Sequence, residues 1–309
     1  MMLSGNARRL NFCLMYLTKP IQAFLPVTPG VLRGLRALSD VCGKFLGRVP
    51  SCAAVEPVSA GGVPGEWVTC GNDIDRRGVI LYLHGGGYFF CSPATHRPLT
   101  WRLARGTKTR VLSLDYRMAP AFTIDDCRAD AVKAYSWLLE RGYAPGDIVV
   151  GGDSAGGGLT LLTLLTLRDR GLPLPRAAFC LSPFADLSQT SPTLNTNART
   201  CHMFHQKILK KVEAFLTAGR DPYDPMLSPA FGDFAGLPPL FIQVADSEML
   251  LNDSLVTAAR AEQAGVAVDL RVWHNLPHVF TLFADILPES KQGIDEIIAF
   301  VNRHLYPRQ

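Results

Sequence analysis

The segment best suited to chemistry is Gly152-Asp-Ser-Ala-Gly156, in which a serine stands between glycines two residues away on either side. It follows a short apolar run at 148–150 and precedes a helical pattern that begins near Ala155. A strand that turns at once into a helix strains its middle residue, and small neighbours relieve the crowding. The serine is then lifted toward the positive end of a helix. This context predicts a nucleophile at Ser154 and disfavours a simple glycine-rich turn.

Three consecutive glycines follow His84, directly after the apolar run 79–83. Such a loop lets backbone amides approach a ligand closely, as an oxyanion hole requires. We expect the amides of Gly86 and Gly87 to be the donors, together with that of Ala155. A phosphate-binding loop is disfavoured because no Lys-Ser or Lys-Thr pair follows and the glycines lack G-x-G-x-x-G spacing. We expect His84 to be structural.

A serine nucleophile needs a base that accepts its proton. His278 follows the expected strand 268–272 and a short turn, and it precedes an apolar stretch. His274 stands nearer the end of that strand and is the competing candidate. His202 and His205 have a spacing that metal ligands can show, but no carboxylate or cysteine cluster accompanies them, so we predict no metal site.

The carboxylate that orients the base should follow the preceding strand. Asp246 and Glu248 stand just beyond 240–244, and spacing alone does not choose between them. Asp253 is a third candidate, which we expect to cap the following helix instead. The resulting chain order of serine, carboxylate and histidine is the one found with strand-to-helix nucleophile turns.

The elements that must position these residues alternate along the chain from about Val55. Continuous apolar runs without polar alternation are typical of strands buried on both faces of a parallel sheet. Helical lengths and spacings separate them, which predicts a mostly parallel sheet with helices on both faces. The expected strands are 79–83, 111–114, 148–150, 177–181, 240–244 and 268–272, and the expected helices are 126–141, 155–170, 253–264 and 289–304.

Two segments lie outside this alternation. Residues 1–50 are helical and irregular, and residues 185–235 contain a helical pattern at 206–218 but no clear strand. We predict that 51–309 is the catalytic domain and that these two segments together form a cap. The apolar run 10–17 is too short to span a bilayer. We expect it to pack on the protein rather than on a membrane.

Composition limits the classes of protein to consider. The 309 residues are 48% hydrophobic and 19% charged, which supports a large core. The net charge is only +4 and the cations are scattered, so nucleic-acid binding has little support. The eight cysteines include no C-x-x-C pair. They are typical of buried thiols in a reducing compartment, which favours a cytoplasmic location.

Together these motifs resemble the hormone-sensitive lipase family of esterases, within the α/β-hydrolase fold, and most closely its bacterial acyl-ester and lactone hydrolases. The similarity covers nearly the whole chain and is carried by His84-Gly-Gly-Gly-Tyr88, Asp115-Tyr-Arg-Met-Ala-Pro120, Gly152-Asp-Ser-Ala-Gly-Gly-Gly158, Leu237-Pro-Pro239 and Pro277-His278. The resemblance implies a helical cap, hydrolysis of short-to-medium acyl esters or lactones, and no cofactor. It also implies that Glu248, rather than Asp246, is the triad acid.

The chain departs from that family's pattern beside the expected pocket. Cys91 replaces a usual glycine, and 121–125 lacks the usual E-x-P-F-P sequence. Tyr88, Phe89 and Phe90 are the expected pocket residues. A small-molecule ester is the expected partner, and a homodimer stays open. A non-catalytic ligand receptor of the same fold and a membrane-associated lipase are the alternative functions.

Overall fold

An eight-stranded sheet forms the centre of the protein in the computed structural model, which describes residues 3–75 and 77–306. The strand order is β1-β2-β4-β3-β5-β6-β7-β8. Neighbours from β4 to β8 pair in parallel, whereas β2 is antiparallel to β1 and to β4. The bounds are β1 Ala53–Ala60, β2 Val63–Cys70, β3 Val79–Leu83, β4 Arg110–Leu114, β5 Ile148–Asp153, β6 Ala177–Leu181, β7 Leu240–Ala245 and β8 Val268–Trp273. The mostly parallel sheet is as predicted.

The hairpin of β1 and β2 is an addition to the strands expected from the sequence. Its turn is Gly61-Gly62, where both residues have positive φ, at 60° and 90°. Most of β1 is exposed or half-buried, because it is the edge strand. It therefore lacks the continuous apolar run that marks strands such as β3 and β6.

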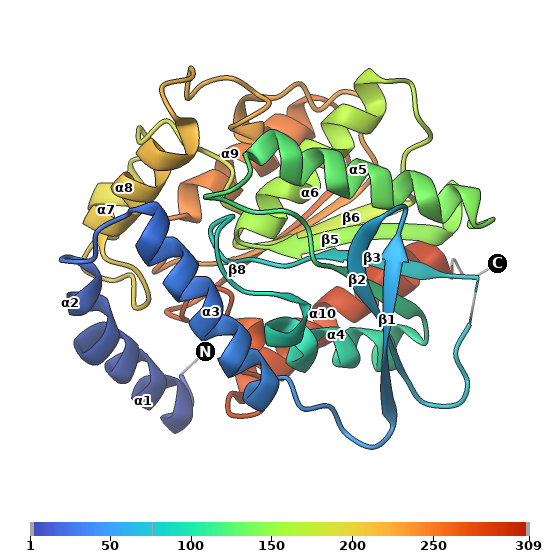
Figure 1. Cartoon of the computed structure of the whole chain (residues 1–309), viewed down its shortest axis with the longest axis horizontal. Coiled ribbons are helices and arrows are strands. Elements are labelled where there is room, and N and C mark those ends of the chain that lie inside the picture. Colours follow the sequence, from blue (N-terminus) through green and yellow to red (C-terminus); the bar gives the residue numbers. More distant parts are fainter. Residues whose placement is uncertain (1–2, 76, 307–309) are drawn as a thin grey trace.

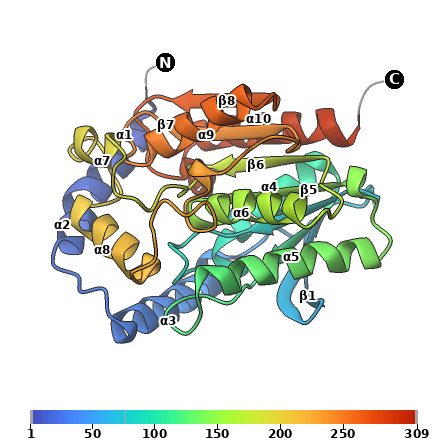
Figure 2. The same ribbon diagram turned by 90° about the horizontal axis from the view of Figure 1, so that it is seen from above.

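Helices cover both faces of the sheet, as predicted (Figures 1 and 2). Alternate β3 side chains point to opposite faces: Leu81 packs in the cluster that contains α5 and α6, and Ile80 packs with α4 and α10. Helix α4 was not predicted, since Pro98 and several basic residues interrupt its pattern. The bounds are α4 Pro93–Thr107, α5 Ile124–Glu140, α6 Ala155–Asp169, α9 Leu251–Gln263 and α10 Pro288–Leu305, with short 3₁₀ turns at Pro145–Asp147, Pro229–Phe231 and Phe280–Phe283.

The N-terminal helices lie beside α7 and α8 in both views (Figures 1 and 2). Lys19 Nζ donates to the carbonyl oxygens of Ala198 and Cys201, at 2.8 and 2.6 Å. Gln22 Nε2 donates to Met203 O at 2.8 Å. Segments distant in sequence are thus tied together, and the cap of 1–50 with 185–235 stays a prediction. The bounds are α1 Gly5–Cys13, a π-helical turn Leu14–Thr18, α2 Lys19–Gln22, α3 Pro29–Leu46, α7 Thr193–Thr196 and α8 Gln206–Thr217.

Candidate active site

Ser154 occupies the turn between β5 and α6 and adopts a positive φ of 52°. A Cβ atom at either Gly152 or Gly156 would overlap the carbonyl oxygen of Leu83. The glycines therefore allow β5, α6 and the end of β3 to meet around the serine. Strain of this kind is held only where the surrounding structure enforces it, and it points the Ser154 side chain into the adjoining cavity.

The imidazole of His278 is held by a buried carboxylate. His278 Nδ1 lies 2.5 Å from Glu248 Oε2, and both side chains are buried. Glu248 Oε1 in turn accepts hydrogen bonds from Ser182 Oγ at 2.7 Å and from Ala245 N at 2.8 Å. These contacts fix the carboxylate and make Nδ1 the nitrogen that carries a proton toward it.

The other nitrogen of His278 faces the cavity. Nε2 has no hydrogen-bond partner among the described residues, Ser154 Oγ included. His278 and Ser154 nevertheless line one cavity. Hydrogen bonds between a nucleophile and its base are often long until substrate is bound, so the missing hydrogen bond does not exclude His278 as the base of Ser154.

The competing candidates for the acid and the base, Asp246 and His274, are paired with each other and do not line the cavity. Asp246 Oδ2 is 2.7 Å from Nδ1 of His274, and its Oδ1 accepts from Asn275 N at 2.7 Å. His274 is exposed. The prediction that Asp253 caps α9 is wrong: it lies within the first turn of α9 and accepts from the amides of Ala185 and Asp186, each at 3.0 Å.

The triple-glycine loop also lines the cavity, through Gly86 and Gly87. Their φ values are 115° and 58°, and a Cβ at Gly86 would overlap the carbonyl oxygen of Phe90. Only glycine fits this path without strain. The loop therefore lies at the same cavity as Ser154, and the amides of Gly86 and Gly87 stay the predicted oxyanion-hole donors.

His84 has the structural role that the sequence indicated. Its Nδ1 lies 2.7 Å from Gly85 O, and its ring stacks on Tyr116 with 4.6 Å between centroids. Burial, with a smaller effect of the neighbouring His96, lowers the pKa of His84 to about 3. The imidazole is therefore neutral at ordinary pH.

A buried ion pair beneath this loop has no signal in the sequence. Asp153 Oδ2 lies 3.2 Å from His96 Nε2, while its Oδ1 accepts from Gly85 N at 3.0 Å and from Tyr82 Oη at 2.6 Å. Burial alone would lower the pKa of His96, but the Asp153 carboxylate raises it above its usual value. Burial alone would raise the pKa of Asp153, but His96 and Tyr82 lower it. Asp153 thus connects the residue before the nucleophile to the glycine loop.

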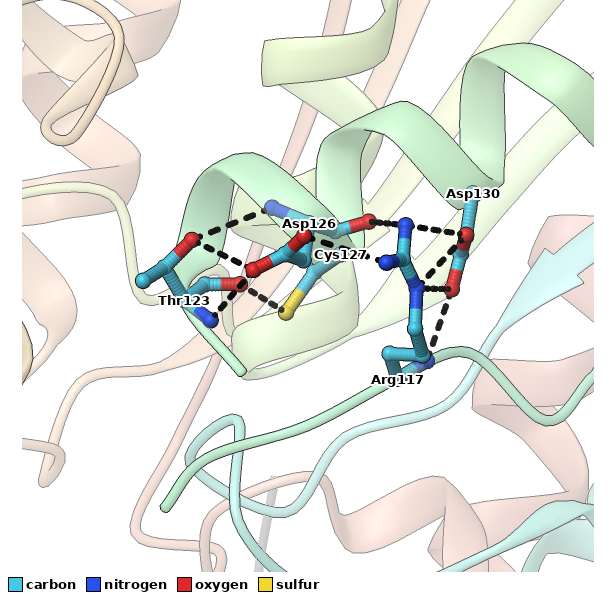
Figure 3. A network of polar contacts seen from close by, with 5 residues as sticks. All are labelled: Arg117, Thr123, Asp126, Cys127 and Asp130. Atoms are coloured by element: carbon cyan, nitrogen blue, oxygen red, sulfur yellow. Dashed lines mark hydrogen bonds and ion pairs between the residues drawn. The ribbon is translucent and has the colours of Figure 1, made fainter. Parts of the chain in front are cut away.

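The Asp115–Pro120 motif braces the same loop from the other side. Tyr116 Oη donates to His84 O at 2.6 Å, and Ala119 N donates to Tyr88 O at 2.8 Å. Arg117 anchors the motif to α5, where its Nη2 lies 2.8 Å from Asp130 Oδ1 and its Nη1 lies 3.1 Å from Asp126 Oδ1 (Figure 3). The motif therefore supports the site without entering the cavity.

The cavity has a volume of about 320 Å³ and is mostly apolar. Phe89 and Phe90 line it, together with side chains from the N-terminal segment and from α8 such as Leu25 and Ile208. The prediction that Tyr88 lines it is wrong. At φ 65° Tyr88 turns into the core, where its hydroxyl lies against Gly158.

His202 and His205 make structural hydrogen bonds. His202 Nε2 lies 2.8 Å from Asn275 Oδ1, and His205 Nδ1 accepts from Lys207 N at the start of α8. Within the described ranges, no group of three His, Cys, Asp or Glu side chains is arranged to hold a metal. A second hollow of about 510 Å³, at Trp67 and Arg110, shares no lining residue with the site.

Comparison with known proteins agrees with this architecture. A family model described as alpha/beta hydrolase fold matches residues 80–282. An acetyl-hydrolase of Streptomyces hygroscopicus is 39% identical over 79% of this chain and 81% of its own. An esterase of Acinetobacter venetianus is 33% identical over 89% of each chain. The chain belongs to the alpha/beta hydrolase fold family.

A solved structure indicates which group of that family the chain resembles. An esterase from the bacterial hormone-sensitive lipase family superposes with a TM-score of 0.89 at 38% identity, over 99% of this chain and 100% of that one. The predicted fold class and resemblance are confirmed, and the protein is a carboxylic ester hydrolase of the serine type. A catalytically inactive receptor is correspondingly disfavoured.

Proposed function

We propose that the protein hydrolyses short-to-medium acyl esters by double displacement on Ser154. His278 is the general base, Glu248 orients it, and the amides of Gly86, Gly87 and Ala155 form the oxyanion hole. The observation that carries the proposal is the buried Glu248–His278 pair, whose free Nε2 faces the cavity that Ser154 lines.

The first half of the reaction forms an acyl-enzyme. His278 Nε2 takes the proton of Ser154 as Oγ attacks the ester carbonyl, and Glu248 stabilises the imidazolium through Nδ1. The carbonyl oxygen becomes an oxyanion that accepts from the loop amides. The intermediate collapses with cleavage of the bond to the alcohol oxygen, and Nε2 returns its proton to that leaving alkoxide.

The second half uses water in place of the alcohol. His278 removes a proton from water as the hydroxide attacks the acyl carbonyl, and the same amides hold the second oxyanion. Collapse releases the carboxylic acid and restores the Ser154 hydroxyl. Nε2 gives the proton taken from water to Ser154 Oγ, so every proton moves between Ser154, the leaving alcohol, water and Nε2, and the residues present suffice for the cycle.

The cavity supports a small apolar acyl group. A space of about 320 Å³ walled by phenylalanine, leucine and isoleucine holds a short hydrocarbon chain better than a charged one. The similarity to an acetyl-hydrolase supports the same size range. Lactones, as cyclic esters, would react by the same steps and are part of the proposed substrate class.

Replacement of the nucleophile tests the proposal. Ser154→Ala should abolish turnover of 4-nitrophenyl butyrate and leave the circular-dichroism spectrum and melting temperature near those of the wild type. Activity retained by a folded Ser154→Ala protein would refute it. A panel of nitrophenyl esters of increasing acyl length, with lactones alongside, would then define the substrate range.

We also propose a cytoplasmic location. Cys127, Cys180 and Cys201 are buried free thiols, which supports a reducing compartment. Among the described helices, none combines the length and hydropathy needed to cross a bilayer. Immunoblotting of separated cell fractions would test the location.

A further inference from the structure

The N-terminal helices leave an unusual number of large apolar side chains in solvent. Among the described residues, eight of the thirteen exposed large hydrophobic side chains fall between residues 12 and 45. Five of them form what we call the N-terminal apolar face: Phe12, Tyr16, Leu17, Ile21 and Phe24. Phe24 is 86% exposed and Ile21 is 66% exposed. Concentrated exposure of this kind marks an interaction surface.

The backbone brings these side chains to one side. They recur three to five residues apart, and the π-helical turn Leu14–Thr18 adds a residue per turn at the place where the spacing lengthens to five. The rings of Phe12 and Tyr16 lie 4.8 Å apart between centroids. The face is therefore continuous along the segment.

The opposite side of the same segment is fixed to the protein. Asn11 and Lys19 are buried there, and Asn11 Nδ2 donates to Asn275 O at 2.9 Å. Lys19 holds two carbonyl oxygens of the 198–201 turn. These contacts occupy one side of the helices, so the N-terminal apolar face cannot fold back onto the core.

The charge of the N-terminal segment indicates which kind of surface the N-terminal apolar face binds. Residues 1–39 contain five Lys and Arg residues and no Asp or Glu. Arg8 and Arg9 are exposed, and both stand within a helical turn of Phe12. Exposed cations beside aromatic and aliphatic side chains are typical of helices that lie in the interface of an anionic bilayer.

The face also adjoins the active site. Gln22, Leu25 and Val27, from the end of the same segment, line the cavity that holds Ser154. A surface bound to the N-terminal apolar face would lie next to residues that wall this cavity.

The sequence led us to expect the run 10–17 to pack on the protein rather than on a membrane; from the exposed side of this segment we propose instead that the N-terminal apolar face docks on an anionic lipid surface. Arg8 and Arg9 lie at the level of the headgroups, and the aromatic rings enter the boundary with the acyl chains. The protein binds to the bilayer and does not span it. This docking is separate from the ester chemistry, since none of the five side chains of the face lines the cavity.

Vesicle co-sedimentation of the full chain tests the proposal. Vesicles of phosphatidylcholine with one quarter phosphatidylglycerol should bind the wild type, and pure phosphatidylcholine or high salt should weaken binding. Ile21→Ser/Phe24→Ser should reduce affinity at least about tenfold, at about 1.4 kcal/mol for each factor of ten. Arg8→Gln/Arg9→Gln should remove the preference for phosphatidylglycerol.

Matched controls separate docking from folding and from catalysis. Leu255→Ser/Val272→Ser changes two exposed apolar side chains elsewhere and should bind like the wild type. Both double-serine variants should keep the melting temperature and the hydrolysis of a water-soluble nitrophenyl ester. The proposal would be overturned if the wild-type protein did not bind the anionic vesicles. It would also be overturned if the Ile21→Ser/Phe24→Ser variant bound them with the wild-type affinity. Sedimentation analysis showing that this variant only dissociates a dimer would overturn it as well.

Discussion

Glu248 Oε2 lies 2.5 Å from His278 Nδ1, whereas Asp246, two residues earlier, is paired with the exposed His274. Glu248→Gln should lower kcat for 4-nitrophenyl butyrate by roughly 10³–10⁴-fold, because the amide cannot stabilise the imidazolium. Asp246→Asn should stay within about threefold of the wild type, since surface pairs contribute little. Initial-rate kinetics measure both, and a reversal of the two effects would assign the acid to Asp246.

The addition of a single Cβ atom at Gly86 should impair the proposed oxyanion hole. A Cβ there would overlap the carbonyl oxygen of Phe90, and φ is 115°. Gly86→Ala should displace the loop amides and reduce kcat/KM by roughly 10²-fold or more. Gly34→Ala is the matched control, because a Cβ at that position meets no atom within 4 Å. Equal activity of the two variants would remove Gly86 from the oxyanion hole.

The His96–Asp153 pair should stabilise the fold over a defined pH range. The pKa of His96 is raised, so its contribution is present below its ordinary pKa and is lost as pH rises through the raised value. The pKa of Asp153 is lowered, so its contribution is present above its ordinary pKa and is lost as pH falls through the lowered value. The pair is therefore strongest between about pH 4 and 6.5.

His96→Gln leaves Asp153 buried without its cation and should destabilise the protein by about 3–5 kcal/mol in that range. His274→Gln disrupts an exposed His–Asp pair and should cost less than about 1 kcal/mol. Urea unfolding at pH 5.5 and pH 8.5 measures both. Equal losses for the two variants at pH 5.5 would contradict the assigned role.

The buried carboxyl of Glu213 on α8 predicts a second pH dependence of the stability. It is 0% exposed, and its carboxyl oxygens have no hydrogen-bond partner among the described residues. Burial, reinforced by the charge of Asp186, raises the pKa of Glu213 to about 8. The folded state then holds a proton that the unfolded chain releases above about pH 4.5, so the stability due to this group falls from there to about pH 8.

Glu213→Gln keeps the shape and removes the charge. It should melt like the wild type near pH 5 and several degrees higher near pH 9, since each pKa unit corresponds to about 1.4 kcal/mol. Glu262→Gln, at an exposed position on α9, is the control and should show no such divergence. A Glu213→Gln protein with the wild-type melting profile at both pH values would show that the carboxyl is solvated.

Much of this fold could be predicted because its central strands, β3 to β7, are buried on both faces. Residues 79–83 and 177–181 are unbroken apolar runs, and the structure makes them strands with those bounds. The edge strand β1 carries no such run, because one side of it is exposed. Helix α4 contains Pro98, which interrupts the helical pattern.

The site was predictable where the backbone itself demands a residue type. Gly152 and Gly156 are required by contact with Leu83 O, and their spacing is visible in the sequence. Tyr88 could not be placed, because one positive φ turns its side chain from the cavity into the core. The pairing of His96 with Asp153 joins residues 57 apart, and no local pattern signals it.

Covalent labelling tests the central claim, that Ser154 is activated by His278 and Glu248, most directly. Protein treated with a fluorophosphonate and digested for mass spectrometry should carry one adduct, on the peptide that contains Ser154. The adduct should be absent from Ser154→Ala and form far more slowly in His278→Ala and Glu248→Gln. Labelling of a different residue, or wild-type labelling rates in His278→Ala, would contradict it.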